Sequence, residues 1–498
     1  MSSKICVSIG RGRHKHMIAE HRHLVEQGAS LVELRLDFIR RAVNLKRLIA
    51  DRPCPTIVTV RRSQDGGRWE DREDARQILL RSAIADGVDY VDLEMDIAGS
   101  IPRFGKTKRI VSYHNFQETP ENLEDLHRQM TELDPDIVKL ATMAHHPQDN
   151  LRMLNLIQSS GVPTVGMCMG EIGTPSRILC GRYGAPFTYA TFHHERALAP
   201  GQLSYRQMTQ VYDFEQITND TKLFGVVADP VAHSLSPLIH NAAFQHLGMD
   251  CRYLPFRVPR EDLTDFVQRQ CGELGVRGLS VTIPHKEAVL PLLTDAAPAV
   301  REVRACNTIV FDDPNRNGFN TDYSAAISSI LAVLGESDDA LKDRDALVLG
   351  AGGAASAIAR ALVDRGARVK ITNRTSARAQ QLAEQLSCRW IEWDDRHSFV
   401  DGILVNATPI GMHPNVDEAP FKAKVLDRKT IVFDTVYNPE QTLLIKEARA
   451  HGCRTITGVD MFVRQAAMQF KLFTGQEAPA DVMRSAIHRA IGAAQIAS

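Results

Sequence analysis

Short hydrophobic runs alternate with stretches of helical period through the first part of the chain. From Lys4 to about Thr191, runs rich in β-branched residues are each followed by enough sequence for a helix. About eight strands in roughly 200 residues predict a compact (β/α)8 barrel, although periodicity alone leaves an open doubly wound sheet as the alternative. The predicted strands are KICVSI, LVELRL, TIVTVR, YVDLEM, RIVSYH, DIVKLA, TVGMCM and PFTYAT.

A second series of elements begins after the polar stretch EQITNDTK at residues 215–222, with the run LFGVVADP. No long Gly/Ser-rich or Pro-rich spacer lies there, so we expect two closely joined parts that share an interface. The length agrees with this division, because 498 residues exceed the roughly 250–300 at which a single core stops growing.

Composition restricts the partners of the chain. The net charge of -1 leaves no basic surplus for nucleic acid phosphates, and no apolar run reaches the roughly 18 residues of a membrane span, so small molecules are expected. The nine cysteines form no CxxC pair, which predicts reduced thiols. No metal is expected, because the early histidines lie among charged residues on a predicted solvated helix and match no zinc spacing. These are His14, His16, His21 and His23.

The amino-terminal sequence MSSKICVSIG leads directly into a predicted strand. It has neither the apolar region of a secretory signal nor an Arg/Ser-rich leader. We therefore expect a complete, cytoplasmic chain, and leave a homodimer open.

Polar residues gather at the carboxyl ends of the first strands. In a barrel these ends form the active-site face, so their recurrence favours one polar mouth over scattered strand-end charges. The residues are Ser8, Glu33, Arg35, Arg61, His114 and Lys139.

Lys139 and His114 end neighbouring strands, an arrangement that suits Schiff-base chemistry on a ketone. The amine must be neutral to attack, and we expect burial beside cations such as Arg35 or Arg61 to favour that form. Arginines also pair with carboxylates through two hydrogen bonds. The predicted substrate is therefore an anionic keto acid.

Six motifs of this half are KICVS, ELRLD, SYHNF, IVKLA, the PSR of GTPSRILCG, and APGQ. With them, residues 1–215 resemble type I 3-dehydroquinate dehydratase, the Schiff-base enzyme of the shikimate pathway. The resemblance implies that Lys139 forms an imine with the substrate ketone, and that His114 removes the C2 proton and then protonates the departing hydroxyl. It also implies substrate binding by Ser8, Glu33, Arg35, Arg61, Arg177 and Gln202.

Two positions depart from that family pattern. Asp65, in RRSQDGG, stands where a glutamate usually orients the histidine, and Leu198 replaces the serine that usually precedes APGQ. These changes motivate an alternative in which the barrel is a ligand-binding or structural module with weak catalysis. The presence of both His114 and Lys139 argues against it.

The segment DALVLGAGGAASAIARAL places Gly350, Gly352 and Ala355 at GxGxxG/A spacing, after a strand and at the start of a helix. This context predicts a dinucleotide pyrophosphate at the helix amino end rather than a plain tight turn. The next strand ends at Asn373 and Arg374, where an NAD site would usually have an acid, and Arg378 follows. Because a guanidinium can pair with a 2'-phosphate, NADP is predicted in preference to NAD.

Four segments before the nucleotide motif carry small hydroxyls and amides beside Lys286 and Asp322: HSLSP, GLSVTIPHK, ACNTIV and GFNTD. Each serine alone could form an ST turn, but together they suit a polyhydroxylated substrate. With GAGGAA, NRT, VNATPIGM and GVDMFVRQAA, they make residues 222–498 resemble shikimate dehydrogenase.

The second resemblance implies that Lys286 and Asp322 form the catalytic pair. The implied substrate residues are Ser234, Ser236, Thr282, Asn307, Tyr437 and Gln465. The expected cofactor residues are Gly350, Ala351, Gly352, Gly353, Ala354, Asn373, Arg374, Thr375, Arg378 and Gly458.

Together, the two resemblances imply a bifunctional enzyme that converts 3-dehydroquinate to 3-dehydroshikimate and reduces it to shikimate with NADPH. A reductase acting on quinate is a further alternative, which Ser234 and Ser236 argue against. The expected fold is α/β, with a (β/α)8 barrel at 1–218, a substrate domain at 219–335 completed by helices at 460–498, and a Rossmann-like domain at 336–459.

Overall fold

The computed structural model describes residues 3–193, 198–335 and 338–497, which form two compact units. The first contains the chain up to Leu223 with Ala228–Ser234 and Asp250–Gly275. The second contains Phe224–Val227, Leu235–Met249 and the chain from Val276 onward.

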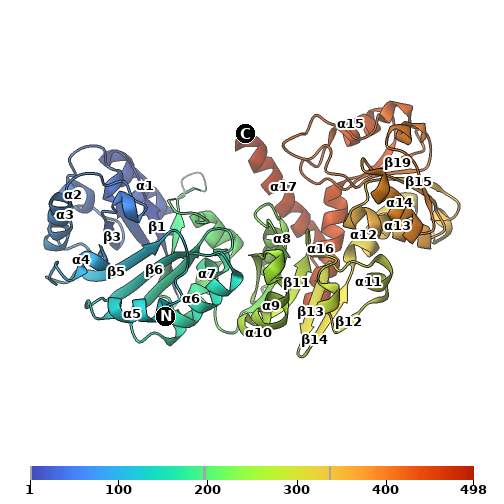
Figure 1. Cartoon of the computed structure of the whole chain (residues 1–498). Helices are drawn as coiled ribbons and strands as arrows, with labels where there is room; N and C mark the ends of the chain where they lie inside the picture. Colours follow the sequence, from blue (N-terminus) through green and yellow to red (C-terminus); the bar gives the residue numbers. More distant parts are fainter. Residues whose placement is uncertain (1–2, 194–197, 336–337, 498) are drawn as a thin grey trace. The chain divides into compact units, whose positions relative to one another are not determined.

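The eight strands predicted for the first part all form, in one parallel sheet of order β7-β6-β5-β4-β3-β2-β1-β8 (Figure 1). In the described part of the chain no backbone hydrogen-bond ladder joins the edge strands β7 and β8, so the barrel is nearly but not fully closed. The strands are β1 Lys4–Ile9, β2 Leu31–Arg35, β3 Thr56–Thr59, β4 Tyr90–Glu94, β5 Lys108–Asn115, β6 Ile137–Met143, β7 Thr164–Met169 and β8 Phe187–Thr191.

Helices cover the outside of this sheet (Figure 1), and the strands are consequently buried on both faces. This is why the sequence shows continuous apolar runs instead of alternation. The helices are α1 His14–Glu26, α2 Leu45–Ile49, α3 Glu73–Ala85, α4 Met95–Ala98, α5 Leu123–Thr131, α6 Pro147–Ser159 and α7 Thr174–Leu179.

The histidine-rich segment forms α1, as predicted, but the prediction of a solvated helix is wrong for His21. Its side chain is buried, its Nε2 lies 3.3 Å from Cys54 Sγ, and burial lowers the pKa of His21 to about 4. The physical reason is a helical stripe, because Met17, Glu20, His21 and Leu24 share the buried face. No group of three or more metal-ligating side chains occurs in the described residues.

The second sheet has the order β10-β9-β11-β13-β14-β12, with antiparallel pairing of β11 to β13 and β13 to β14. Its strands are β9 Lys222–Ala228, β10 Cys251–Arg257, β11 Val276–Val281, β12 Asp295–Ala296, β13 Thr308–Asp312 and β14 Asn315–Phe319. The helices of this region are α8 Ser236–His246, α9 Leu263–Asp265, α10 Cys271–Leu274, α11 Pro298–Val303 and α12 Thr321–Leu334.

The third sheet is parallel throughout, with the order β17-β16-β15-β18-β19-β20. Numbered from its first strand this is 3-2-1-4-5-6, the dinucleotide-binding order. The strands are β15 Asp345–Leu349, β16 Arg368–Thr372, β17 Arg389–Trp390, β18 Ile403–Asn406, β19 Ile431–Asp434 and β20 Arg454–Ile456. The helices are α13 Gly353–Asp364, α14 Ser376–Gln385 and α15 Leu443–Ala450.

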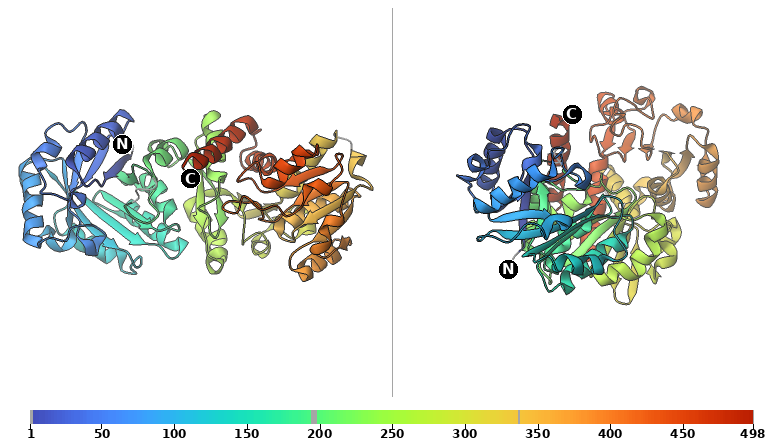
Figure 2. Two further views of the ribbon diagram at one scale, coloured as in Figure 1. Left: turned by 90° about the horizontal axis from the view of Figure 1, so that it is seen from above. Right: turned by 60° about the vertical axis from the view of Figure 1, so that its left-hand side comes forward.

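Two helices end the chain, α16 Gly458–Thr474 and α17 Ala480–Ala497. Gln469 of α16 accepts a hydrogen bond from Ser280 Oγ at 2.8 Å and donates to Asn307 O at 3.1 Å. Helix α17 packs against α8 (Figure 2). Both helices thus contact elements that precede the nucleotide-binding sheet.

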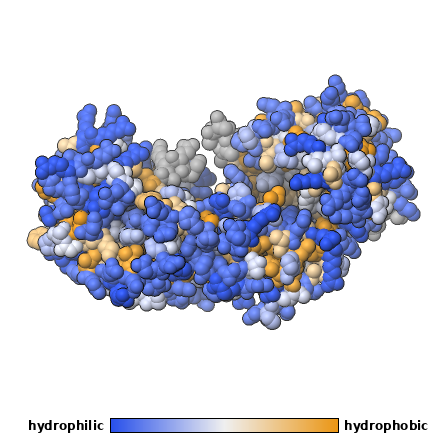
Figure 3. Space-filling view, viewed as in Figure 1, coloured by the Kyte–Doolittle hydropathy of each residue, from blue (hydrophilic) through white to orange (hydrophobic). Residues whose placement is uncertain are grey.

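One face of the molecule is largely polar. On the face drawn in Figure 3, hydrophobic residues occur in small groups among hydrophilic ones. Within the described residues, no helix combines the length and apolar character needed to cross a membrane. All nine cysteines are free, as the lack of CxxC pairs predicted.

Candidate active sites

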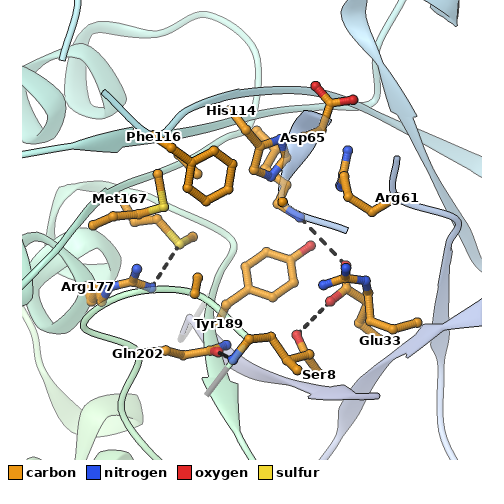
Figure 4. Close-up of a pocket in the computed structure, with 17 residues that line it drawn as sticks. Ser8, Glu33, Arg61, Asp65, His114, Phe116, Met167, Arg177, Tyr189 and Gln202 are labelled. Carbon is orange, nitrogen blue, oxygen red and sulfur yellow. Dashed lines mark hydrogen bonds and ion pairs between the residues drawn. The ribbon is translucent and has the colours of Figure 1, made fainter. Parts of the chain in front are cut away.

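One pocket inside the barrel brings together all eight residues that the sequence assigned to the first site (Figure 4). They come from β1, β2, β5 and β6, from the segments that follow β3 and β8, and from α7. Parallel strands open at one end of a barrel, so residues far apart in sequence meet there. The eight are Ser8, Glu33, Arg35, Arg61, His114, Lys139, Arg177 and Gln202.

Lys139 and His114 point to the same side of the sheet. The register pairs Ser112 with Lys139 and His114 with Ala141, and residues two apart on a strand share a face. His114 therefore lies one dipeptide nearer the pocket mouth than Lys139. Both side chains therefore enter one pocket from adjacent strands.

The surroundings of Lys139 correct one prediction. Its Nζ lies 2.9 Å from Asp92 Oδ2, 3.6 Å from Glu33 Oε1 and 4.1 Å from the centre of the Tyr189 ring. Cations were expected beside this amine, but its nearest charged neighbours are carboxylates. Lys139 is therefore held in the pocket by Asp92 and Glu33.

The two arginines expected to favour the neutral amine are themselves paired. Arg61 contacts Asp92 Oδ2 at 2.8 Å and Glu94 Oε1 at 2.9 Å, and Arg35 binds both oxygens of Asp37. Burial alone would raise the pKa of Asp92, but Arg61 and Lys139 hold that pKa well below its usual range. Asp92 is consequently a fixed negative charge between Arg61 and Lys139.

Arg177 differs from the other arginines of the pocket because it is buried without a carboxylate partner among the described residues. Its Nη2 donates to Pro200 O at 3.1 Å, its Nη1 contacts Met167 Sδ at 3.4 Å, and its Nε has no partner there. Burial lowers the pKa of Arg177 to about 10. A cation held in this way is prepared for an anion that enters the pocket.

His114 is half-buried, and no hydrogen bond from another described residue fixes its ring. Burial, then the charges of Arg61 and Lys139, lower the pKa of His114 well below 6.5, although Asp92 opposes the shift. The imidazole is therefore neutral and able to accept a proton. Asp65 also lines the pocket, but its carboxylate pairs with Arg62 Nε at 2.6 Å and points away from the pocket centre (Figure 4).

Hydrogen bonds to neighbouring residues fix other polar side chains of the pocket. Glu33 accepts hydrogen bonds from Ser8 Oγ at 2.6 Å and Thr59 Oγ1 at 2.8 Å. Gln202 Oε1 accepts from the backbone N–H of Leu198 at 2.9 Å. This bond holds the Gln202 side chain beside Leu198, the position where the family pattern has a serine.

In the second unit, Lys286 Nζ lies 2.6 Å from Asp322 Oδ2. Lys286 follows β11, and Asp322 lies in the first turn of α12, where the helix dipole stabilises a carboxylate. The carboxylate thus fixes the direction of the Lys286 side chain. The predicted pair is formed.

Four other residues predicted for this site also lie in the second unit. Asn307 Oδ1 accepts from the backbone N–H of Thr321 at 2.8 Å, and the hydroxyl of Thr321 lies 3.4 Å from Gln465 Oε1. Thr282 belongs to the turn after β11, since its carbonyl accepts from His285 N at 2.8 Å. Tyr437 stacks on Phe462 with ring centres 5.0 Å apart.

The two predicted serines lie on either side of the division between the units. Ser234 belongs to the first unit, where its backbone N–H donates to Val231 O at 3.0 Å. Ser236 belongs to the second unit and begins α8 as a buried residue. Ser234 therefore lies on the connection between β9 and α8, and Ser236 is the first residue of α8.

The glycine motif has the backbone that a dinucleotide needs. Gly350 has a φ of +117°, and a Cβ there would meet Ala407 O at 2.7 Å, whereas a Cβ at Gly352 would meet nothing within 4 Å. Helix α13 begins directly after Gly352 without a side-chain cap, so its first N–H groups are free for phosphate oxygens. The motif thus fits a dinucleotide pyrophosphate.

A pocket of about 690 Å³ opens beside this motif. Ala351, Gly352, Gly353 and Arg378 line it, as expected of cofactor residues. Six other predicted cofactor residues do not line this cavity: Gly350, Ala354, Asn373, Arg374, Thr375 and Gly458.

Asn373 follows β16, and its Nδ2 donates to Thr375 O at 3.0 Å. Arg374 and Arg378 are exposed and pair with no carboxylate among the described residues. The charges at the end of β16 therefore suit a 2'-phosphate.

A Cβ at Gly458 would lie 2.3 Å from Val436 O, which explains why only glycine fits at the start of α16.

Three residues at the barrel pocket were not predicted from the sequence: Tyr189, which lines it, and Asp92 and Glu94, which pair with its cations. The two acids lie in the strand YVDLEM, and acids inside a buried strand need partners. That signal was present. Tyr189 carries no comparable signal, because an aromatic residue in a buried strand is ordinary core.

Protein-family models match most of the chain. Type I 3-dehydroquinase matches residues 5–219, and the shikimate dehydrogenase substrate binding domain matches 226–309. Shikimate/quinate 5-dehydrogenase matches 333–405, and the shikimate 5'-dehydrogenase C-terminal domain matches 458–488.

Individual relatives agree with the family models. The chloroplastic bifunctional 3-dehydroquinate dehydratase/shikimate dehydrogenase of Arabidopsis thaliana is 37% identical over 505 residues, covering 96% of this chain and 83% of that protein. A shikimate dehydrogenase (NADP(+)) of Methanopyrus kandleri is 42% identical over 280 residues, 54% of this chain and 95% of that protein.

Two solved structures resemble the second half. A crystal structure of a shikimate dehydrogenase in complex with NADP+ is 36% identical with a TM-score of 0.52, covering 55% of this chain and 97% of that one. The quinate dehydrogenase of Corynebacterium glutamicum in complex with NAD is 30% identical with a TM-score of 0.50, covering 54% of this chain and 99% of that one.

Proposed function

Because the chain belongs to the family of bifunctional 3-dehydroquinate dehydratase/shikimate dehydrogenases, we propose that it catalyses two consecutive reactions. The barrel dehydrates 3-dehydroquinate to 3-dehydroshikimate. The second half reduces that product to shikimate with NADPH. The domains of this enzyme are the barrel at 1–218, the substrate domain at 219–335 completed by 460–498, and the nucleotide domain at 336–459.

In the barrel, Lys139 attacks the substrate ketone and forms an imine with loss of water. Attack requires the amine in its neutral form, with Asp92 and Glu33 as its nearest charged neighbours. Neutral His114, one dipeptide nearer the mouth, then removes the C2 proton and returns it to the departing hydroxyl. Hydrolysis of the imine releases the product and restores Lys139.

The observation that carries the dehydratase assignment is the buried, unpaired guanidinium of Arg177 in the same pocket as Lys139. A module with only a structural role has no use for a buried cation without a partner, because burying it costs free energy. The carboxylate of 3-dehydroquinate supplies that partner. Ser8, Glu33, Arg35, Arg61 and Gln202 surround the substrate hydroxyls.

Borohydride trapping tests this assignment. Reduction in the presence of 3-dehydroquinate should attach the substrate to Lys139, detected by mass analysis of the peptide that contains it. Lys139→Met serves as the control and should remain unlabelled. Failure to label the unsubstituted chain would favour the alternative, in which the barrel is a binding or structural module.

In the second half, Lys286 donates or relays a proton to the C3 oxygen of 3-dehydroshikimate. Asp322, 2.6 Å away, keeps the ammonium charged and aimed. Ser234, Ser236, Thr282, Asn307, Tyr437 and Gln465 bind the substrate.

NADP is the cofactor, and NADPH supplies the hydride. The glycine motif admits its pyrophosphate at the start of α13, and Arg374 or Arg378 pairs with its 2'-phosphate. The lack of an acid at the end of β16 removes the repulsion that would exclude that phosphate. Gly350, Ala351, Gly352, Gly353, Ala354, Asn373, Thr375 and Gly458 shape the site.

Lys286→Ala should lower kcat for shikimate oxidation by about 100-fold to 10,000-fold, the usual contribution of a general acid or base. Substrate binding should remain nearly intact, because the surrounding hydroxyls and amides are unchanged. Steady-state kinetics with a direct titration of shikimate separates the two effects. An unchanged kcat would remove Lys286 from the mechanism.

The similarity to a quinate dehydrogenase keeps quinate as a second candidate substrate. Oxidation rates with shikimate and quinate, measured with NADP+ and with NAD+, discriminate between them. We expect shikimate and NADP+ to give the higher kcat/KM.

A further inference from the structure

Glu171, on the barrel loop between β7 and α7, contacts the region that follows β9. Its Oε1 accepts a hydrogen bond from the backbone N–H of Val231 at 2.8 Å, and its Oε2 accepts from Arg257 Nη1 at 3.1 Å. Arg257 in turn donates through Nε to Asp229 Oδ1 at 2.8 Å. All four residues belong to the first compact unit.

The segment held in this way leads to a proposed substrate residue of the dehydrogenase. Residues 229–235 connect β9 to α8, and the backbone N–H of Ser234 donates to Val231 O at 3.0 Å. Val231 therefore takes part in both bonds: its N–H donates to Glu171, and its carbonyl accepts from Ser234. The acceptor of Val231 N–H comes from the barrel, not from the dehydrogenase half.

Burial makes this contact important for the shape of the loop. Val231 is 3% exposed, and the side chain of Glu171 is only 22% exposed. A buried backbone N–H that loses its acceptor pays the full desolvation cost unless the loop moves toward water. Removal of the Glu171 carboxylate should therefore change the conformation of the loop at residues 229–235.

We propose that Glu171 is a positioning residue for the dehydrogenase, through which the barrel fixes the loop that carries Ser234. The inference rests on the proposed function, in which Ser234 binds the dehydrogenase substrate. The barrel then contributes to the second reaction without touching its substrate.

Two other polar contacts in the first unit provide matched controls. His146 Nδ1 lies 3.0 Å from Asp262 Oδ2, and Gln148 Oε1 accepts from Arg269 Nη2 at 2.6 Å. They join the barrel to the segment that follows β10, as Glu171 joins it to Arg257. Neither bonds to residues 229–235.

The test compares full-length Glu171→Ala, Glu171→Gln and His146→Ala. Glu171→Ala should raise KM for shikimate by about tenfold, the loss of one charge-assisted hydrogen bond, with kcat and the dissociation constant of NADP+ unchanged. Glu171→Gln should show a smaller rise, because its amide oxygen can still accept from Val231. His146→Ala should leave KM unchanged.

Dehydratase turnover and thermal melting of each variant check that the chain has folded. An unchanged KM in Glu171→Ala, or an equal rise in His146→Ala, would overturn the proposal. A normal KM for shikimate in Ser234→Ala would also overturn the proposal, because Glu171 could then not act through Ser234. If the unsubstituted chain does not oxidise shikimate at all, the proposed function fails, and the proposal fails with it.

Discussion

Arg177 and Arg61 are both buried in the barrel pocket, but their partners differ. Arg61 lies against Asp92 and Glu94, whereas Arg177 faces a thioether and a carbonyl. We therefore expect Arg61 to stabilise the barrel through its ion pairs and Arg177 to bind an anionic ligand. Substitutions can separate the two roles, because losing Arg61 should lower stability whereas losing Arg177 should not.

Arg177→Met should raise KM for 3-dehydroquinate by about 100-fold, since losing one partner of a buried charge pair costs about 2–5 kcal/mol. The melting temperature should stay level or rise, because an uncompensated buried charge is removed. Arg61→Met should instead destabilise the barrel by about 3–5 kcal/mol, as it leaves buried carboxylates unpaired. Kinetics and thermal denaturation of both variants provide the comparison, and a large loss of stability in Arg177→Met would contradict it.

The lowered pKa of His114 gives a pH dependence with a defined sign. The base must be neutral to accept the C2 proton, and its pKa lies well below 6.5 because of burial, Arg61 and Lys139. The imidazole therefore stays neutral as the pH falls through about 6.5, and kcat/KM of the dehydratase should decline only at lower pH. A pH profile measures this, with melting temperatures at each pH as the control. An acid limb centred at or above about 6.5 would count against the assignment.

At the scale of elements, the start of α13 combines two glycines with different tasks. Gly350 needs its positive φ and lies close to the chain after β18, whereas Gly352 has an ordinary φ of -96° and open space beside it. The first glycine serves the turn, and the second serves the approach of a ligand to the helix.

Gly350→Ala should destabilise the nucleotide domain by about 1–3 kcal/mol, because its backbone is strained for any Cβ and Ala407 O is in the way. Gly352→Ala should leave stability unchanged but weaken NADPH binding, since its methyl group occupies the surface facing the pyrophosphate. Residual dehydrogenase activity after heating and a fluorescence titration with NADPH report the two effects. Equal phenotypes for the two variants would refute this division.

The elements of the barrel were predictable because a strand buried on both faces leaves a continuous apolar run such as TVGMCM, which forms β7 with the predicted bounds. Side-chain partners were not predictable in the same way. Arg61 follows β3, whereas Asp92 and Lys139 lie within β4 and β6, and only barrel closure shows which carboxylate reaches which cation. The bond from Glu171 to Val231 leaves no sequence signal, because its donor is a backbone N–H.

At the scale of the whole molecule, the proposed mechanism gives one chain two sites in which lysine has opposite requirements. Lys139 must lose its proton to attack a ketone, whereas Lys286 must keep its proton beside Asp322. Fusion fixes the ratio of the two sites and raises the local concentration of the shared intermediate, but it does not require channelling. Because 3-dehydroshikimate is released from a hydrolysed imine, a free intermediate can serve both sites.

An added trap for free 3-dehydroshikimate should therefore suppress NADPH oxidation by the unsubstituted chain supplied with 3-dehydroquinate. The time course without the trap should show an initial lag while the intermediate accumulates. A lag-free course that the trap does not affect would instead demonstrate channelling. The same assay with 3-dehydroshikimate as the starting substrate controls for direct inhibition by the trap.

The most direct measurement of the central claim is NADPH oxidation by full-length protein supplied with 3-dehydroquinate as the only carbon substrate. The unsubstituted chain should oxidise NADPH, while Lys139→Met and Lys286→Ala should each fail, and an equimolar mixture of the two variants should recover activity. If the unsubstituted chain consumes NADPH with 3-dehydroshikimate but not with 3-dehydroquinate, the barrel is not a dehydratase and the two-site account is wrong.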